Sequence, residues 1–284
     1  MNIKKKHILH FALALFFLSL IFVIFLPYFT TDFLDLRQQQ ENEENHQRFL
    51  REQRAIEQAK KDAEEKIYLM GKFDSAKRED FILIPKEYTL GSNKMYARKE
   101  TYVAFLEMRK SALFQDVDLR VVSATRNFDY QKELWNNKWN GKTLVNGKDL
   151  SKSIPDGLER FEKILEFSAA PGTSRHHWGT DLDINGVSPT YFDTKEGKIQ
   201  YEWLVQNAPL FGFCQVYNQR DENRPAGYSE EKWHWSYLPL SRTFTQDYER
   251  LIKETDITGF DGDEYAPYLN LIQNYVLSIN PECV

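Results

Sequence analysis

The chain has 284 residues, which is too long for one small domain and suits an anchor, a spacer and one catalytic unit. Its formal net charge of -5 gives no basis for binding nucleic acid, whose partners carry excess positive charge. No internal repeat is apparent, so the sequence also excludes a repeat architecture.

Residues 1–29 carry a targeting signal. A cluster of lysines, Lys4 to Lys6, precedes an almost entirely apolar run over residues 8–28. About 20 apolar residues span a bilayer as a helix, and a basic cluster stays on the cytoplasmic side. A cleaved signal peptide is the alternative, because the central apolar run is only slightly longer than a signal core. No small residues suited to cleavage follow, so we expect an uncleaved single-pass transmembrane helix at the cell membrane, with the remaining chain extracytoplasmic.

Residues 30–78 are expected to form a charged helical spacer. From Asp35 to Lys72 the chain is rich in Gln, Glu, Lys and Arg and almost free of Gly and Pro, which favours one long helix. An apolar residue recurs every seven positions at Phe49, Ile56 and Ala63, but so few apolar positions do not make a sustained coiled coil. Weak self-association through this helix is the alternative to a solvated spacer.

Residues 79–284 read as the catalytic unit, with short helices and strands in alternation. Apolar residues at helical spacing and runs rich in β-branched residues define these elements. We expect helices at 99–111, 129–139, 157–167 and 201–207, and strands at 119–124, 180–184, 211–217 and 233–237. Two amphipathic helices beyond Pro239, the second over 268–276, are expected to cover the sheet. The predicted fold class is therefore α+β, a small antiparallel sheet with flanking helices and a metal site on one face.

Two polar segments suggest that metal site. Zinc takes three protein ligands from imidazole and carboxylate groups and leaves a fourth position open in catalytic sites. His176, Asp183 and His234 would supply the three ligands, and Glu231 would accept a proton from the attacking water. His176 and Asp183 are an odd number of residues apart, so a turn with Gly179 as its pivot must bring His176 back. Hydrogen-bonded histidines without metal are the alternative.

The order of these motifs resembles a known family. The pattern Ser-x-His-x-x-Gly-x-x-x-Asp, followed by Glu-x-Trp-His, resembles the VanY-like zinc D-alanyl-D-alanine carboxypeptidases over about residues 85–240. The resemblance implies one zinc ion held by His176, Asp183 and His234, with Glu231 as the catalytic base. It also implies a substrate-gripping arginine, Arg126, in Ser-x-x-Arg. We place Ser174, the serine of the first motif, with Arg126 among the substrate-binding residues.

Some residues near these motifs are not explained by the resemblance. Asp181 stands where many members carry a small residue such as Ala, and Lys232 where many carry Pro. Asp181 adds a negative charge near the metal and leaves the fine substrate preference open. His177 is not assigned as a ligand. In an extracytoplasmic chain, Cys214 and Cys283 are expected to pair, with two unrelated thiols as the alternative.

The N-terminal segment implies a membrane-anchored, extracytoplasmic protein, and the resemblance implies a zinc metallopeptidase, a hydrolase of the cell wall. We expect a D,D-carboxypeptidase that removes terminal D-alanine from peptidoglycan stem peptides. An L,D-carboxypeptidase, a dipeptidase or an endopeptidase with the same zinc site are alternatives. An inactive cell-wall-binding module is the alternative from a different class, although such a module has no chemical reason to keep Glu231.

Overall fold

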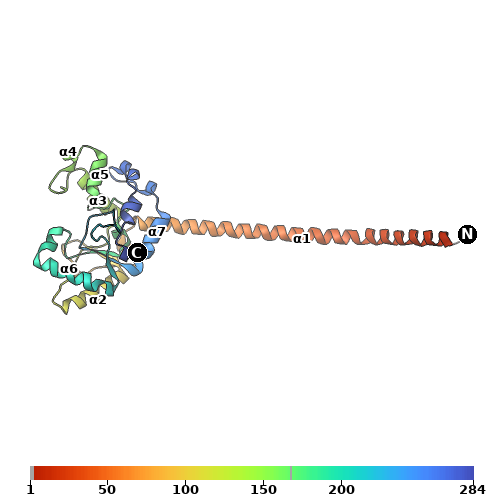
Figure 1. The fold of residues 1–284 in the computed structure, drawn as a ribbon, viewed down its shortest axis with the longest axis horizontal. Helices are drawn as coiled ribbons and strands as arrows, with labels where there is room; N and C mark the ends of the chain where they lie inside the picture. The colour runs from red at the N-terminus through yellow and green to blue at the C-terminus, as the bar shows by residue number, and fades with distance from the viewer. Residues whose placement is uncertain (1–2, 167) are drawn as a thin grey trace. The chain divides into compact units, whose positions relative to one another are not determined.

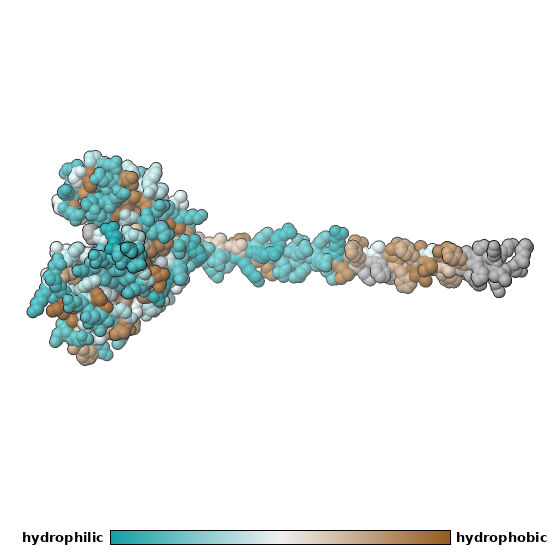
Figure 2. Space-filling view, viewed as in Figure 1, coloured by the Kyte–Doolittle hydropathy of each residue, from teal (hydrophilic) through white to brown (hydrophobic). Residues whose placement is uncertain are grey.

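The computed structural model describes residues 3–166 and 168–284 and divides the chain into two units, residues 1–61 and residues 62–284. The first unit consists of the greater part of α1, Ile3–Leu69. Figure 2 shows hydrophobic residues gathered on the N-terminal part of this helix and hydrophilic residues on the part that follows. Among the described residues, no helix is both long enough and apolar enough to cross a membrane.

The second unit is an α+β fold, as predicted. Its helices are α2 Lys99–Leu113, α3 Phe128–Trp139, α4 Leu150–Ser153, α5 Gly157–Leu165, α6 Lys195–Asn207 and α7 Leu238–Leu251. Its strands are β1 Phe81–Leu83, β2 Tyr96–Arg98, β3 Val121–Ser123, β4 Asp181–Ile184, β5 Phe213–Gln215 and β6 His234–Tyr237. β1 and β2 form an antiparallel pair, and the other four strands form an antiparallel sheet in the order β3-β4-β6-β5.

Side chains at the starts of three helices fix where those helices begin. Asn127, Asp156 and Thr194 each accept a hydrogen bond from a backbone N–H of the first helical turn. Such caps satisfy donors that have no partner within the helix. The cap at Thr194 explains why α6 begins at Lys195, earlier than the expected start at Tyr201.

Two separate cores flank the four-stranded sheet. One face packs against α2 and α6, with Phe105, Met108 and Leu204 buried against Leu182 and Trp235 of the sheet. The other core lies among α3, α5 and the C-terminal segments, as the separation of α2 and α6 from α3, α4 and α5 in Figure 1 shows. The sheet therefore has one largely apolar face, and its other face is free to carry polar groups.

The expected second C-terminal helix over 268–276 does not form as an α-helix. A 3-10 turn covers Asp263–Tyr268 and a π-turn covers Ile272–Val276. Pro267 lies inside the first turn and cannot donate a backbone hydrogen bond, and Asn270 adopts a left-handed conformation with φ 46. These two residues interrupt the apolar pattern that had suggested a helix. The expected helical position of Phe167 lies outside the described residues.

The cysteine pairing predicted from the sequence is confirmed. Cys214 in β5 and Cys283 near the C-terminus form a disulfide that joins positions 69 residues apart. The disulfide fastens the C-terminal segment to the edge of the four-stranded sheet.

The compact unit also includes residues that we had assigned to the spacer. Tyr68 and Leu69, at the end of α1, and Met70, which follows it, are buried. The Tyr68 hydroxyl donates to the Trp178 carbonyl at 2.5 Å, and Trp178 Nε1 donates to the Leu69 carbonyl at 3.1 Å. The last turns of α1 thus pack as part of the second unit, which begins at Asp62 rather than near residue 79.

Candidate metal centre and active site

The register of the sheet brings two of the predicted ligands face to face. Asp183 of β4 lies directly opposite His234 of β6 and pairs with Ser123 of β3 on its other side. Because side chains alternate along a strand, Asp183 and His234 project from the face opposite to that of Leu182 and Trp235, which are in the apolar core. The imidazole and the carboxylate therefore meet on the polar face.

The third predicted ligand reaches this face on a short turn. His176 lies in the 3-10 turn Arg175–Trp178, which ends at Gly179 with φ 75. A Cβ at Gly179 would lie 2.4 Å from the ring of Phe81, so glycine is required both for the left-handed conformation and for the close approach. The predicted pivot at Gly179 is confirmed. The turn places His176 Nε2 3.3 Å from Asp183 Oδ1.

The three side chains have the geometry of a metal site. One ligand atom from each of His176, Asp183 and His234 lies within 4.8 Å of the others, and all three residues are buried. His176 Nδ1 lies 2.9 Å from the Ala124 carbonyl, so Nδ1 carries the proton and the lone pair of Nε2 faces the centre.

Two atoms at this centre lack partners. Apart from their 3.3 Å contact with each other, His176 Nε2 and Asp183 Oδ1 are buried without a hydrogen-bond partner among the described residues. Buried polar atoms are nearly always paired, so these two atoms are where a cation would restore the missing interaction. Two imidazoles and one carboxylate form a donor set that fits zinc and leaves a position open.

Glu231 lies beside this group. Its Oε2 is 3.2 Å from His234 Nδ1, and the residue is buried. Burial raises the pKa of Glu231 above its ordinary value, although the contact with His234 opposes this shift. A carboxylate with a raised pKa is a stronger base, which suits a group that accepts a proton near neutral pH.

The charges around the ligands shift their pKa values in different directions. Burial lowers the pKa of His176, and the nearby Arg126 guanidinium lowers it further. Burial would also lower the pKa of His234, but hydrogen bonds to Asp181 and Glu231 outweigh it and raise the pKa to about 9. Burial would raise the pKa of Asp183, but the interactions with His176, His234 and Arg126 lower it to about 2. Asp183 is therefore a carboxylate at neutral pH and ready to bind a cation.

Arg126 and Ser174 lie at the edge of the same centre. The Arg126 N–H donates to the His176 carbonyl at 3.1 Å, and Arg126 Nη2 lies 3.8 Å from Asp183 Oδ2. Arg126 Nε is buried without a partner among the described residues. Ser174, Arg126 and Glu231 share a small cavity of ≈ 30 Å³ with the two histidine ligands. The structure thus gathers all six predicted site residues in one place.

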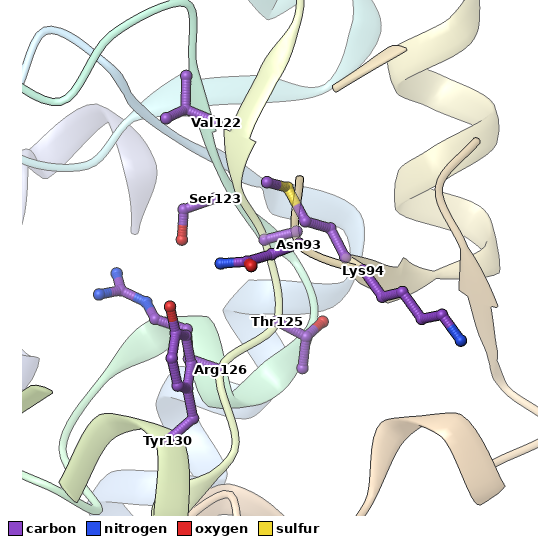
Figure 3. A pocket seen from close by; sticks show the side chains of 9 residues that line it. Asn93, Lys94, Val122, Ser123, Thr125, Arg126 and Tyr130 are labelled. Atoms are coloured by element: carbon purple, nitrogen blue, oxygen red, sulfur yellow. The ribbon is translucent and has the colours of Figure 1, made fainter. Parts of the chain in front are cut away.

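A larger cavity adjoins the site on the other side of Arg126. It has a volume of ≈ 320 Å³ and is lined by Asn93, Lys94, Met95, Val122, Ser123, Ala124, Thr125, Arg126 and Tyr130. In Figure 3 the Arg126 side chain points into this space, whereas Lys94 extends away from it. Arg126 therefore stands between the polar centre and the open cavity, where a charged end of a ligand would reach it.

His177 supports the arginine and is not directed at the metal site. Its Nδ1 donates to the Arg126 carbonyl at 2.6 Å, and its Nε2 accepts a hydrogen bond from the Gly172 N–H at 3.1 Å. Burial lowers the pKa of His177 to about 3, so the ring is neutral and keeps both hydrogen bonds at neutral pH. This histidine ties the Arg126 loop to the loop that precedes His176.

Sequence reasoning did not assign roles to Asp181 and Arg175. Asp181 is fully buried and lies 3.2 Å from Arg175 Nε and 2.9 Å from His234 Nε2. Burial would raise the pKa of Asp181, but the Arg175 guanidinium and His234 hold it well below its ordinary value. The expected extra negative charge is thus neutralised within the fold. The spacing carried a signal, because residues two apart in a strand share one face, and this places Asp181 beside Asp183.

Comparison with known proteins gives results in agreement with this geometry. The family described as D-alanyl-D-alanine carboxypeptidase, VanY, matches residues 94–240. The chain is 28% identical over 171 residues to a putative carboxypeptidase, YodJ, of Bacillus subtilis, covering 58% of this chain and 52% of that protein. It is 39% identical over 74 residues to a D-alanyl-D-alanine carboxypeptidase of Enterococcus faecalis, covering 25% of each chain.

Solved structures give more distant matches. The LdcB LD-carboxypeptidase aligns with 24% identity and a TM-score of 0.44, covering 66% of this chain and 77% of that one. A vancomycin-resistance D,D-pentapeptidase, VanY, in complex with Zn(II), aligns with 24% identity and a TM-score of 0.41, covering 64% and 93%. The chain spans about half the length of the first curated relative and a quarter of the second.

Proposed function

Because the chain belongs to the VanY family of D-alanyl-D-alanine carboxypeptidases, we propose that it is a zinc peptidase that removes terminal D-alanine from peptidoglycan stem peptides. The observation that carries this proposal is the convergence of three buried ligand atoms within 4.8 Å of one another, with a carboxylate at their edge. A binding module would need neither the orphaned ligand atoms nor the adjacent base.

In this proposal His176 Nε2, His234 Nδ1 and an Asp183 oxygen hold one zinc ion. Zinc bound there would lower the pKa of a water to about 7 and polarise the scissile carbonyl. Glu231 takes a proton from the attacking water and passes it to the leaving amine. Its burial supports this role, because a desolvated carboxylate gains affinity for the proton.

Arg126 is the group that recognises the end of the substrate. Its planar guanidinium fits a terminal carboxylate through two parallel hydrogen bonds, and its Nε is buried with no partner among the described residues. Ser174 lines the same cavity and can contact the terminal residue. A carboxypeptidase must bind the free C-terminal carboxylate of its substrate beside the catalytic base. The adjoining cavity of ≈ 320 Å³ offers room for neighbouring parts of the ligand.

The test is mass spectrometry of purified muropeptides after incubation with the purified full-length protein. Loss of one terminal D-alanine from pentapeptide stems is the expected result. Loss of alanine from tetrapeptide stems would instead show L,D-carboxypeptidase activity, loss of two residues a dipeptidase, and cleaved cross-links an endopeptidase. Unchanged muropeptides in the presence of added zinc would contradict an enzymatic role.

We also propose that residues 1–29 anchor the chain in the cell membrane, with the catalytic unit on the extracytoplasmic side. The support is the lysine cluster followed by about 20 apolar residues in the sequence. The described large apolar side chains between Phe11 and Leu26 are exposed on α1, and such a surface needs cover. Membrane fractionation of cells that produce the full chain tests this, and recovery in the supernatant after lysis without detergent would contradict it.

A further inference from the structure

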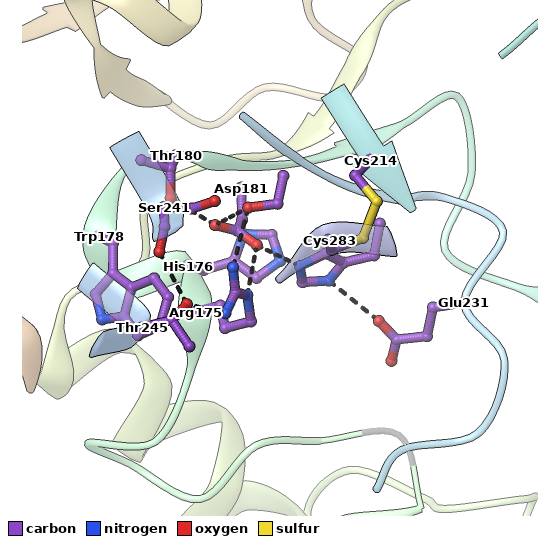
Figure 4. A network of polar contacts seen from close by, with 12 residues as sticks. Arg175, His176, Trp178, Thr180, Asp181, Cys214, Glu231, Ser241, Thr245 and Cys283 are labelled. Atoms are coloured by element: carbon purple, nitrogen blue, oxygen red, sulfur yellow. Dashed lines mark hydrogen bonds and ion pairs between the residues drawn. A yellow bond between two sulfur atoms is a disulfide. The ribbon is translucent and has the colours of Figure 1, made fainter. Parts of the chain in front are cut away.

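A buried ionic pair lies directly behind one of the three ligands. Asp181 Oδ1 accepts hydrogen bonds from His234 Nε2 at 2.9 Å and from Arg175 Nε at 3.2 Å. Asp181 Oδ2 accepts from Thr180 Oγ1 at 2.6 Å and from Ser236 Oγ at 3.1 Å. Figure 4 shows Asp181 between Arg175 and the imidazole that reaches Glu231. Both carboxylate oxygens of Asp181 thus accept hydrogen bonds, and one of these bonds comes from the proposed ligand His234.

The Arg175 guanidinium, like the Asp181 carboxylate, makes several buried contacts. Its Nη1 donates to Thr245 Oγ1 at 2.9 Å and its Nη2 to Ser236 Oγ at 3.2 Å. The guanidinium carbon lies 4.5 Å from the ring centroid of Trp178. Arg175 is 1% exposed and Asp181 is 0% exposed, so the pair is costly to bury unless its partners have good geometry. The many donors and acceptors around the pair supply that geometry.

The Asp181–Arg175 pair determines which ring nitrogen of His234 is available to bind a metal ion. Because Nε2 donates to Asp181, the other nitrogen, Nδ1, faces Asp183 Oδ1 at 3.6 Å and Glu231 Oε2 at 3.2 Å. Without Asp181 the buried Nε2 would lose its acceptor, and the ring would be free to rotate so that Nδ1 no longer faces Asp183 and Glu231.

The two histidine ligands therefore differ in their outer partners. His176 Nδ1 donates to a neutral backbone carbonyl, that of Ala124, whereas His234 Nε2 donates to a carboxylate. A carboxylate behind a histidine fixes its orientation and makes it a stronger donor to a metal, and loss of such a partner lowers metal affinity by about 10- to 100-fold.

We propose that Asp181, held by Arg175, is a positioning residue that orients His234 so that Nδ1 faces the metal site, and that it thereby sets the affinity for zinc. The inference rests on the proposed zinc site and extends it beyond the three ligands and the base. Asp181 itself lines neither cavity and does not contact the base, so it reaches the site through His234 and through Arg175, which lines the small cavity.

The test compares zinc affinity with the stability of the metal-free protein. Asp181→Asn removes the charge but leaves Arg175 buried without its counter-ion, and this variant risks misfolding. The double variant Asp181→Leu/Arg175→Met removes both charges and replaces them with apolar side chains, an exchange that folds commonly tolerate. Asp118→Asn is the matched control, because Asp118 pairs with Arg109 and Arg120 away from the site.

We expect the metal-free double variant to melt in one cooperative transition, at a temperature lowered by the donors of Thr180, Ser236 and His234 that lose their acceptor, while its zinc dissociation constant, measured below that transition by competition with a chromogenic chelator, rises by about 10- to 100-fold. The Asp118→Asn control should bind zinc as the parent does. A folded double variant with the affinity of the parent would overturn the inference and leave the proposed function standing. A parent that binds no zinc would overturn the proposed function, and this inference with it.

Discussion

Replacement of Glu231 by Gln separates the proposed base from the proposed ligands. The substitution preserves the shape of a buried side chain whose Oε2 lies 3.2 Å from His234 Nδ1, and it leaves His176, Asp183 and His234 unchanged. The variant should therefore still bind about one zinc ion per chain. A positioned general base contributes about 10²- to 10⁴-fold to rate, so the barrier should rise by about 3 to 5 kcal/mol.

The assay measures bound zinc in dialysed protein alongside D-alanine release from a peptide that ends in D-alanyl-D-alanine. His234→Ala is the contrasting variant, because it leaves only two protein ligands and should release the zinc. Glu230→Gln is the matched control, since this neighbouring carboxylate interacts with Tyr201 rather than with the ligands, and it should behave as the parent. Loss of zinc from Glu231→Gln would identify Glu231 as a ligand, and full activity in that variant would remove it from the mechanism.

Three further predictions concern substrate recognition, the disulfide and the N-terminus. Arg126→Lys should lower activity on peptides with a free C-terminus by about tenfold or more, because a charge-assisted contact contributes about 1.5–3 kcal/mol; Arg120→Lys serves as the control, and equal rates would make Arg126 structural. Cys283→Ser should lower the melting temperature by about 10 °C, because closing a loop of 69 residues contributes about 4 kcal/mol in the chain-entropy model. Dithiothreitol should then destabilise the parent but not the variant, and two free thiols in the unreduced, denatured parent would contradict the pairing. Intact-mass analysis of the mature protein should show an uncleaved N-terminus, and a start beyond residue 28 would show that a signal peptide is removed.

The polar face of the sheet was largely predictable, because its strands and the turn before β4 follow from the residue types within each short segment. The β-branched and aromatic runs indicated β3, β4 and β6, and the odd separation of His176 and Asp183 required the turn that Gly179 provides. The sequence could not show that Asp183 would lie opposite His234, because strand register depends on pairing between distant segments.

The C-terminal region illustrates why apolar periodicity alone was insufficient. Tyr268, Leu269, Ile272 and Val276 have helical spacing, but Pro267 and the left-handed Asn270 break the backbone hydrogen bonds that a helix requires. Leu269, Ile272 and Val276 still pack against the cores, Val276 fully buried. The pattern therefore predicted the packing of Leu269, Ile272 and Val276 correctly, but Tyr268 is 75% exposed and the predicted backbone conformation was wrong.

The end of α1 shows how a segment with spacer composition becomes part of the catalytic unit. Lys66 pairs with Asp256 at 2.8 Å, and Tyr68 and Leu69 exchange hydrogen bonds with Trp178, two residues after the ligand His176. The segment is rich in Gln, Glu, Lys and Arg, and this composition does not show that three residues where the long charged helix ends are buried. A boundary between spacer and catalytic unit that is drawn from composition therefore lies too late in the chain. Because Trp178 belongs to the same turn as His176, its hydrogen bonds with α1 stabilise the turn that carries this proposed ligand. The proposed metal site thus depends on residues outside the segment that carries its motifs.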